Sequence, residues 1–169
     1  SKVRPIAIAE CLRRWAAIAL NLEVMRESHR FSFFSPFQWA VAVPSGAEAL
    51  HRIIEAHLFL NPHHFCAKLD VKNAFNSVSR SVLWAATERY LPRLLPYVHT
   101  FYTAPSLVRA HLPGLGPVSF QMCRGVQQGD PLGTLLFSLV LHHQLEPVWS
   151  SAPSLLHNAF ADACHGFCF

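Results

Sequence analysis

The chain contains three aspartates, Asp70, Asp130 and Asp162, and each falls at a strand end or in a loop beside apolar residues. Asp70 ends one predicted strand and Asp162 lies in the turn of a predicted hairpin, so their carboxylates would converge if those strands pair. Carboxylate oxygens are ligands that Mg²⁺ takes, and it readily shares them with substrate phosphates. Two such ions about 4 Å apart could clamp the attacking and leaving oxygens of a phosphoryl transfer. Spacing alone, however, favours the simpler interpretation that both aspartates close turns.

The elements that would position these residues follow from the hydrophobic pattern. Apolar residues recur at helical spacing at Leu12, Trp15, Ile18 and Leu22, which predicts a helix there. Ser45 is the predicted N-cap of a second helix, because a glutamate follows three residues later. In chain order we predict a strand over 3–9, helices over 10–25 and 45–60, a strand over 65–70, a helix from 77 or 79 to 90, a hairpin of strands 107–112 and 118–122, a buried helix over 132–145 and a hairpin of strands 155–162 and 165–169.

Together these elements predict an α+β fold. An antiparallel sheet would carry Asp70 and Asp162, and the helices that follow Asn76 and Pro131 would cover it. The 169 residues suffice for one domain with a hydrophobic core. With 51% hydrophobic and 14% charged residues, the chain is apolar for a protein that stands alone in water. We therefore expect it to be a piece of a larger protein.

Composition argues against several other classes of protein. The five cysteines are an odd number at irregular spacing, unlike a disulfide framework, so we expect an intracellular, reducing location, with the nucleus as one option. Cys164, His165 and Cys168 come closest to zinc-ligand spacing, but a strand is the better interpretation there. The longest apolar run, 132–141, is about half of the ~20 residues that span a bilayer, so no membrane partner is expected. The net charge of +4 suits an anionic partner without requiring one.

Four strings resemble, in order and at similar separations, the motifs of reverse transcriptases of the non-LTR retrotransposon type. They are KVRPI at 2–6, QWAVAVPSGAE at 38–48, LDVKNAFN at 69–76 and GVQQGDPLG at 125–133. The second string departs from the family at Ala40 and Ala42, where glycine is common. The resemblance covers nearly the whole chain and implies a fingers-side segment over 1–64 and a palm over 65–169.

The resemblance also implies roles for individual residues. Asp70 and Asp162 would be catalytic and would bind Mg²⁺ through their side chains, and Val71 would bind it through its backbone carbonyl. Arg4 would hold the incoming triphosphate, although the residue alone could equally be a solvated charge at a strand end. Phe75 would stack under the sugar and exclude a 2′-hydroxyl, although it could also be a core aromatic.

The motif at 125–133 would complete the nucleotide-binding site. Gln128 would touch the nascent base pair, and Gly129 would let the backbone approach the nucleotide. Asp130 is not expected to bind metal, because a carboxylate there can accept N–H bonds at the start of the following helix and favour its dipole. Cations such as Arg80 and Arg109 could contact template or primer phosphates, although single exposed cations commonly serve solubility only.

The third palm motif departs from the family pattern of an aromatic residue, any residue and two aspartates. This chain reads Phe160-Ala161-Asp162-Ala163, so the second carboxylate is missing. Loss of such a group commonly costs orders of magnitude in rate. We therefore expect impaired catalysis, as in an inactive copy of a mobile element. We also expect the thumb that follows the palm in complete enzymes to be absent from this chain.

Four functions are compatible with these residues. The first is an RNA-directed DNA polymerase domain that transfers a nucleotidyl group from dNTP to the 3′-hydroxyl of a DNA primer on an RNA template, by a two-metal mechanism. The second is a non-catalytic remnant that keeps the palm fold and at most binds nucleic acid, which Ala163 favours. An RNA-directed RNA polymerase is less consistent with Phe75, because such enzymes need a smaller or polar residue there. A zinc-binding protein comes last, for want of ligand spacing.

Overall fold

The structure is a computed structural model that describes residues 7–27, 34, 37–151, 156–160 and 163–168. Its helices are α1 (Cys11–Arg26), α2 (Gly46–Leu60), α3 (Ala74–Ser77), α4 (Arg80–Tyr90), α5 (Leu95–Tyr102) and α6 (Gly133–Ser151), with a 3₁₀ turn, η2, at Pro92–Leu94. Its strands are β1 (Phe65–Asp70), β2 (Ser106–Leu112), β3 (Gly116–Met122), β4 (Leu156–Phe160) and β5 (Ala163–Cys168). The predicted α+β class is confirmed.

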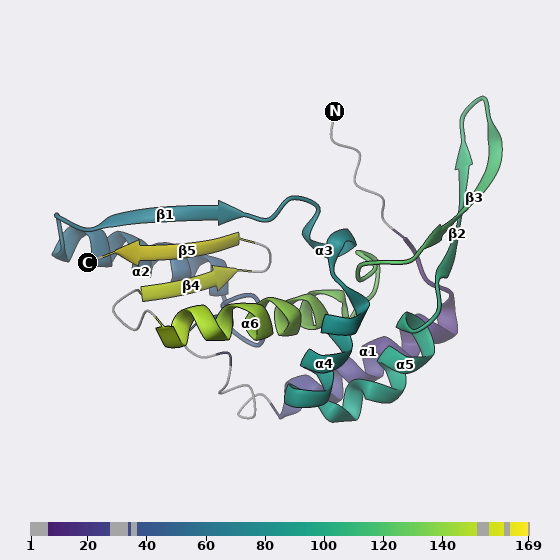
Figure 1. The fold of residues 1–169 in the computed structure, drawn as a ribbon, viewed down its shortest axis with the longest axis horizontal. Coiled ribbons are helices and arrows are strands. Elements are labelled where there is room, and N and C mark those ends of the chain that lie inside the picture. Colours follow the sequence, from purple (N-terminus) through teal and green to yellow (C-terminus); the bar gives the residue numbers. More distant parts are fainter. Residues whose placement is uncertain (1–6, 28–33, 35–36, 152–155, 161–162, 169) are drawn as a thin grey trace.

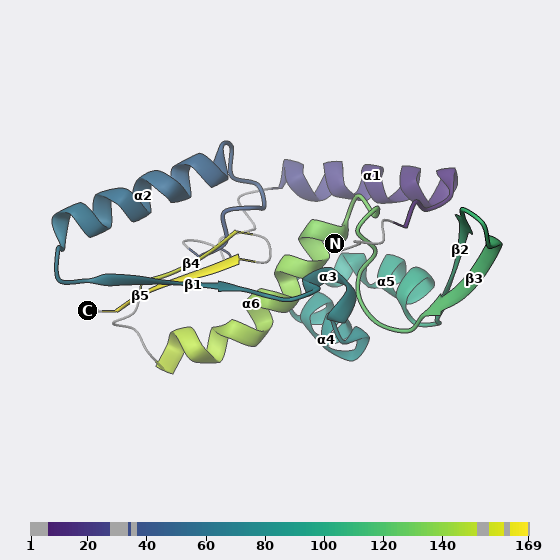
Figure 2. The ribbon, with the colours of Figure 1, turned by 90° about the horizontal axis from the view of Figure 1, so that it is seen from above.

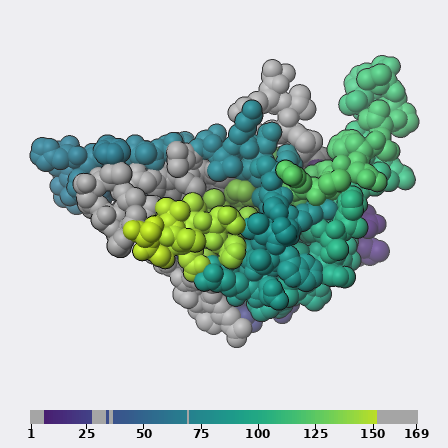
Figure 3. Space-filling view, in the orientation of Figure 1, coloured from purple at the N-terminus to yellow at the C-terminus, as the bar shows by residue number. Residues whose placement is uncertain are grey.

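The described strands form two antiparallel sheets (Figure 1). Strands β1, β5 and β4 lie side by side in that order, and β2 and β3 form a separate hairpin. The hairpin turns at Gly114 and Gly116, which both have positive φ, as the predicted turn requires. In the space-filling view this hairpin projects from the body of the molecule (Figure 3). Figure 2 shows the three-stranded sheet nearly edge-on, with α2 on one side of it and α6 on the other.

The hydrophobic core gathers around α6. Leu135, Leu136 and Leu139 of this helix are buried and belong to one cluster with Leu83 and Ala86 of α4. The prediction that this helix is buried is therefore confirmed. In the part of the chain that the structure describes, no helix is both long and apolar enough to cross a membrane.

Helix α1 is confirmed, but its predicted apolar face does not enter the core. The four residues of that face are 42–72% exposed, namely Leu12, Trp15, Ile18 and Leu22. The buried residues of α1 are instead Arg13, Ala17 and Val24. In this rotation of the helix Arg13 faces the interior, where it binds Asp130 at 2.9 Å.

Three predictions about element boundaries are wrong. Residues 7–9, the described part of the strand predicted over 3–9, are irregular, because their backbone packs against Gly129. Ser45 has a φ of 52° and its side chain makes no cap hydrogen bond, so α2 begins without the predicted capping box. Helix α6 continues through Pro147 to Ser151, beyond the predicted end. The turn at that proline is tied to α4 by hydrogen bonds to Glu146.

Candidate active site

Asp70 is the last residue of β1 and lies where β5 begins. The two strands pair antiparallel, and the register places Asp70 opposite Ala163. Residues that face each other in such a pair have Cα atoms about 4.5–5.5 Å apart. The pairing assumed by the metal-site prediction is thus observed, and Asp70 is exposed at the sheet edge. Asp162 lies outside the described residues, so its role stays a prediction.

The turn after β1 carries the next predicted site residues. Val71 is exposed, and Asn73 takes the left-handed conformation that starts α3. Phe75 of α3 stacks on Phe137 of α6, with ring centroids 4.8 Å apart and an interplanar angle of 23°. Phe75 is only half-buried, so the core holds part of its ring while the rest stays accessible. Both interpretations of this residue, core aromatic and wall of a site, are compatible with the packing.

The loop over 125–130 is joined to this turn through the backbone. The Gly125 N–H donates to the Val78 carbonyl (2.8 Å), and the Val126 N–H donates to the Phe75 carbonyl (2.7 Å). Gly125 has a φ of 81°, and a Cβ there would lie 2.6 Å from the Cα of Asn76. Only glycine permits both this conformation and this approach. Two of the family-like strings, far apart in sequence, are therefore in direct contact next to the end of β1.

The same loop meets the segment that follows Arg4. A Cβ on Gly129 would overlap the carbonyl oxygen of Ala7, so no larger residue fits unless that segment moves. Gln128, the residue before it, is half-buried. Arg4 lies outside the described residues, and its contact with a triphosphate stays a prediction. The loop that carries Gln128 and Gly129 therefore lies against both the N-terminal segment and the turn after β1.

Asp130 is the centre of a buried polar cluster that links three parts of the chain. Its Oδ2 accepts hydrogen bonds from Arg13 Nη2 (2.9 Å), the Tyr97 hydroxyl (2.9 Å) and the Tyr102 hydroxyl (2.6 Å). Its Oδ1 accepts the Leu132 N–H at 2.9 Å, which confirms the predicted N–H bond at the start of the helix. The other three bonds were not predicted, because their donors come from α1 and α5.

Burial and nearby charges shift the pKa values of the two tyrosines and of Arg13 in this cluster. Burial first, and then the charge of Asp130, raise the pKa of Tyr97 and of Tyr102, so both hydroxyls stay protonated and donate. Burial opposes the charge of Arg13, but the Tyr97 hydrogen bond and the surrounding groups, Asp130 among them, outweigh it and raise the pKa of the guanidinium. The two tyrosines are therefore neutral donors, and the arginine beside them is charged.

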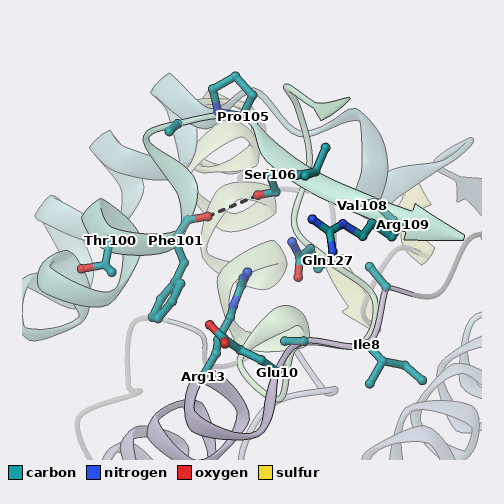
Figure 4. A pocket seen from close by; sticks show the side chains of 14 residues that line it. Ile8, Glu10, Arg13, Thr100, Phe101, Pro105, Ser106, Val108, Arg109 and Gln127 are labelled. Atoms are coloured by element: carbon teal, nitrogen blue, oxygen red, sulfur yellow. Dashed lines mark hydrogen bonds between the residues drawn. The ribbon is translucent and has the colours of Figure 1, made fainter. Parts of the chain in front are cut away.

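An open cleft of about 770 Å³ lies beside this cluster, between the start of α1, the junction of α5 with β2, and the loop (Figure 4). Figure 4 shows the side chains of Arg109 and Gln127 on one wall, with Arg13 and Phe101 facing them. Gln127 is buried, whereas Arg109 is exposed on β2. The cleft thus offers amide and guanidinium donors next to the loop that carries Gln128.

The Arg80 side chain is held by hydrogen bonds to backbone carbonyls within the fold. Its Nη1 donates to the Ala104 carbonyl at 2.5 Å and its Nη2 donates to the Met122 carbonyl at 2.8 Å. These bonds tie α4 to the base of the β2–β3 hairpin. Among the cations considered for phosphate contacts, Arg80 is therefore better explained as a structural residue.

The described residues contain no group of three or more His, Cys, Asp or Glu side chains that could hold a metal ion. Next to the end of β1 they offer the Asp70 carboxylate and the Val71 carbonyl. Mg²⁺ is usually bound by one or two carboxylates together with waters and substrate phosphates, so these groups fit one such ion in part. The paired carboxylate that a two-ion site would add is absent, because residue 163 is alanine.

The chain is similar in sequence to part of a known protein. No protein-family model matches the chain. The chain is 28% identical over 166 residues to the retrovirus-related Pol polyprotein from the type-2 retrotransposable element R2DM of Drosophila melanogaster. The match covers 95% of this chain and 15% of that protein, so the chain spans a small part of its relative.

The fold is similar to that of telomerase. The structure of telomerase from Candida albicans in complex with a fragment of telomeric RNA matches with a TM-score of 0.58 and 14% identity, over 90% of this chain and 30% of that one. Telomerase from Candida tropicalis, truncated from the C-terminal domain, matches with a TM-score of 0.57 and 13% identity, over 90% and 34%. At these identities the likeness is one of fold. The sequence similarity along nearly the whole chain and the shared fold agree with the four ordered motifs, and together they support a resemblance of this chain to part of a reverse transcriptase.

Proposed function

We propose that this chain forms the nucleotide-binding and catalytic region of an RNA-directed DNA polymerase. In the longer polypeptide it would transfer a nucleotidyl group from dNTP to the 3′-hydroxyl of a DNA primer paired with an RNA template. One observation carries the proposal: segments with family-like motifs are joined through their backbones. Strand β1, which ends at Asp70, pairs with β5, the turn after β1 is hydrogen-bonded to the 125–130 loop, and that loop lies against Ala7.

The residue roles follow from this arrangement. Asp70, Asp162 and the Val71 carbonyl would hold Mg²⁺, which when bound would offset the negative charge that develops on the triphosphate. Arg4 would contact the same phosphates, since the segment that follows it lies against Gly129. Phe75 would restrict the sugar, because stacking on Phe137 braces its ring and prevents it from swinging away.

The loop and the residues around it would contact the template strand and the nascent base pair. Gln128 and Gly129 would lie against the nascent base pair, as the resemblance implies. The RNA-bound telomerase with a similar fold supports an RNA template as the partner. The net charge of +4 and the exposed Arg109 beside the cleft are consistent with a polyanionic strand. An intracellular location, with the nucleus as one option, suits such a partner.

We also propose that this copy is catalytically impaired. The backbone register pairs Asp70 with residue 163, so the position of the family's second aspartate is directly opposite Asp70 in the two strands. The alanine found there removes one negative charge from a site that must hold divalent cations. The alanine at position 163 also favours the second candidate function, a remnant that keeps the fold and at most binds nucleic acid.

Primer extension tests the proposal. The longer polypeptide that contains this chain is compared with its Ala163→Asp variant on an RNA template, with a DNA primer, dNTPs and Mg²⁺. We expect extension by Ala163→Asp alone, and its loss in the matched control that adds Asp70→Asn. Extension by neither polypeptide would favour the remnant. Equal primer extension by both polypeptides would mean that the second carboxylate is dispensable and that the proposed catalytic impairment is wrong.

A further inference from the structure

The Arg13–Asp130 pair is buried deeply enough to require an explanation. The side chains of Arg13 and Asp130 are 9% and 0% exposed. Removing two charges from water costs about as much as their attraction returns, so such a pair is weak support for stability. Its better attested use is to select one arrangement among several. Here the arrangement in question is that of α1 and α5 around the 125–130 loop.

The cluster acts on the loop through Asp130. The Asp130 N–H donates to the Gln127 carbonyl at 3.1 Å, and the Gln127 N–H lies 3.4 Å from the Tyr102 hydroxyl. Gln128 and Gly129 lie between these two anchored residues. Their backbone path is therefore set by where the Asp130 carboxylate is held.

Arg13 supplies the connection to the other side of the loop. It lies in the first turn of α1, directly after the segment whose Ala7 carbonyl meets Gly129. Figure 4 shows Arg13 projecting from α1 toward the region of Gln127. The Arg13 side chain thus connects the first turn of α1 with the loop through Asp130. Without it, the Gly129 contact would be maintained by backbone packing alone.

We propose that Arg13 is a positioning residue, whose ion pair with Asp130 holds Gln128 and Gly129 in the arrangement that binds the incoming nucleotide. Arg13 acts through Asp130 and need not touch the nucleotide. The consequence for nucleotide binding rests on the proposed function, whereas the effect on the loop does not.

Hydrogen exchange of backbone amides tests the effect on the loop in this chain itself. Arg13→Met removes the charge and the two hydrogen bonds that Arg13 donates, one to Asp130 Oδ2 (2.9 Å) and one to the Tyr97 hydroxyl (3.4 Å), and Arg13→Lys keeps the charge. The matched control is Arg89→Met, which breaks an ion pair of the same 2.9 Å length, at an arginine that is 53% exposed and is bound to Glu146 of α6 instead of to the loop. We expect amide exchange over the 125–130 loop to speed up by roughly tenfold or more in Arg13→Met. Exchange in α4 should stay nearly unchanged, and Arg13→Lys should restore slow exchange in the loop.

Unchanged amide exchange over the 125–130 loop in a folded Arg13→Met chain would overturn the proposal. A uniform increase along the whole chain would overturn it too, because it would show a general structural role. If Arg13→Met does not fold, Arg13→Gln is compared with Arg89→Gln, since both changes remove the charge and keep a polar side chain. Faster exchange confined to the loop in Arg13→Gln supports positioning, and equal exchange in the two glutamine variants refutes it.

Nucleotide binding tests the consequence. In the longer polypeptide with Ala163→Asp, we expect Arg13→Met to weaken dNTP binding by roughly tenfold, the size of effect seen when groups that orient binding residues are removed. Unaltered dNTP binding, with faster exchange in the loop, would refute the consequence while leaving the proposed function intact. Absence of dNTP binding in the polypeptide with Arg13 would instead count against the proposed function, and the exchange result would still decide whether Arg13 positions the loop.

Discussion

The contact at Gly125 yields the sharpest prediction about how the candidate site is assembled. In Gly125→Ala the new methyl group would lie 2.6–2.7 Å from backbone atoms of Phe75 and Asn76, in a conformation with a φ of 81°. The left-handed conformation costs about 1–2 kcal/mol once a Cβ is present, and loss of the two backbone hydrogen bonds between the loop and the turn adds about 0.5–1.5 kcal/mol each. We therefore expect destabilisation by roughly 2–5 kcal/mol.

Gly114→Ala is the matched control, because Gly114 has the same φ of 81° and nothing lies within 4 Å of its hypothetical Cβ. It should cost only the conformational part, about 1–2 kcal/mol. Thermal and urea unfolding of the two variants and the original chain measure the difference. For a chain of this size, each kcal/mol lowers Tm by roughly 2–4 °C. Equal destabilisation by the two substitutions would refute the close packing of the loop against the turn after β1.

The remaining predictions concern the sugar and the tyrosines. In the longer polypeptide with Ala163→Asp, Phe75→Ala should reduce the preference for dNTP over rNTP in primer extension, because it removes the ring that stacks on Phe137. Phe75→Tyr, the control, should retain the preference. An unchanged preference in Phe75→Ala would contradict the role of Phe75 at the sugar. Burial, and then the hydrogen bond to Glu146, raise the pKa of Tyr90 to about 12, and the pKa values of Tyr97 and Tyr102 are raised as well. Because the folded pKa lies above the ordinary value near 10, the stability that Tyr90 contributes is complete below pH 10 and is lost as pH rises toward 12. Phenolate absorbance should therefore stay low just above pH 10 until the chain unfolds, and half-ionisation near pH 10 in a folded chain would contradict this.

Local sequence accounts for much of the candidate site. The alternating residues from Phe65 to Asp70 predict a strand that ends on a carboxylate, and the structure has that strand with those bounds. The glycines at 125 and 129 sit in a polar loop before an apolar helix, which is the order that the structure shows. Structure can be predicted from patterns of this kind because strand alternation and turn preferences depend on residues that are neighbours in the sequence. The chemical roles of Asp70, Val71, Asp162, Arg4 and the nucleotide-binding residues remain predictions.

Helix boundaries were less predictable, for reasons that lie outside each helix. Ser45 and Glu48 have the residue types of a capping box, yet the Gly46 N–H donates to the Val43 carbonyl in a turn and Ser45 takes a left-handed conformation. Pro147 would normally end a helix, but the hydrogen bonds from α4 to Glu146 hold the adjacent turn in place. Packing in these places overrides the local preference.

The sequence by itself determined which segments become β1, α1 and α6, and it placed a carboxylate at the end of a strand and glycines in the loop before α6. Only the tertiary structure decided which face of α1 turns inward. Periodicity selected the face with Leu12 and Trp15, but the buried bond between Arg13 and Asp130 joins residues separated by 117 positions in the sequence. A charge is buried only where its partner and donors converge, and that convergence exists only once α1, α5 and the loop are packed together.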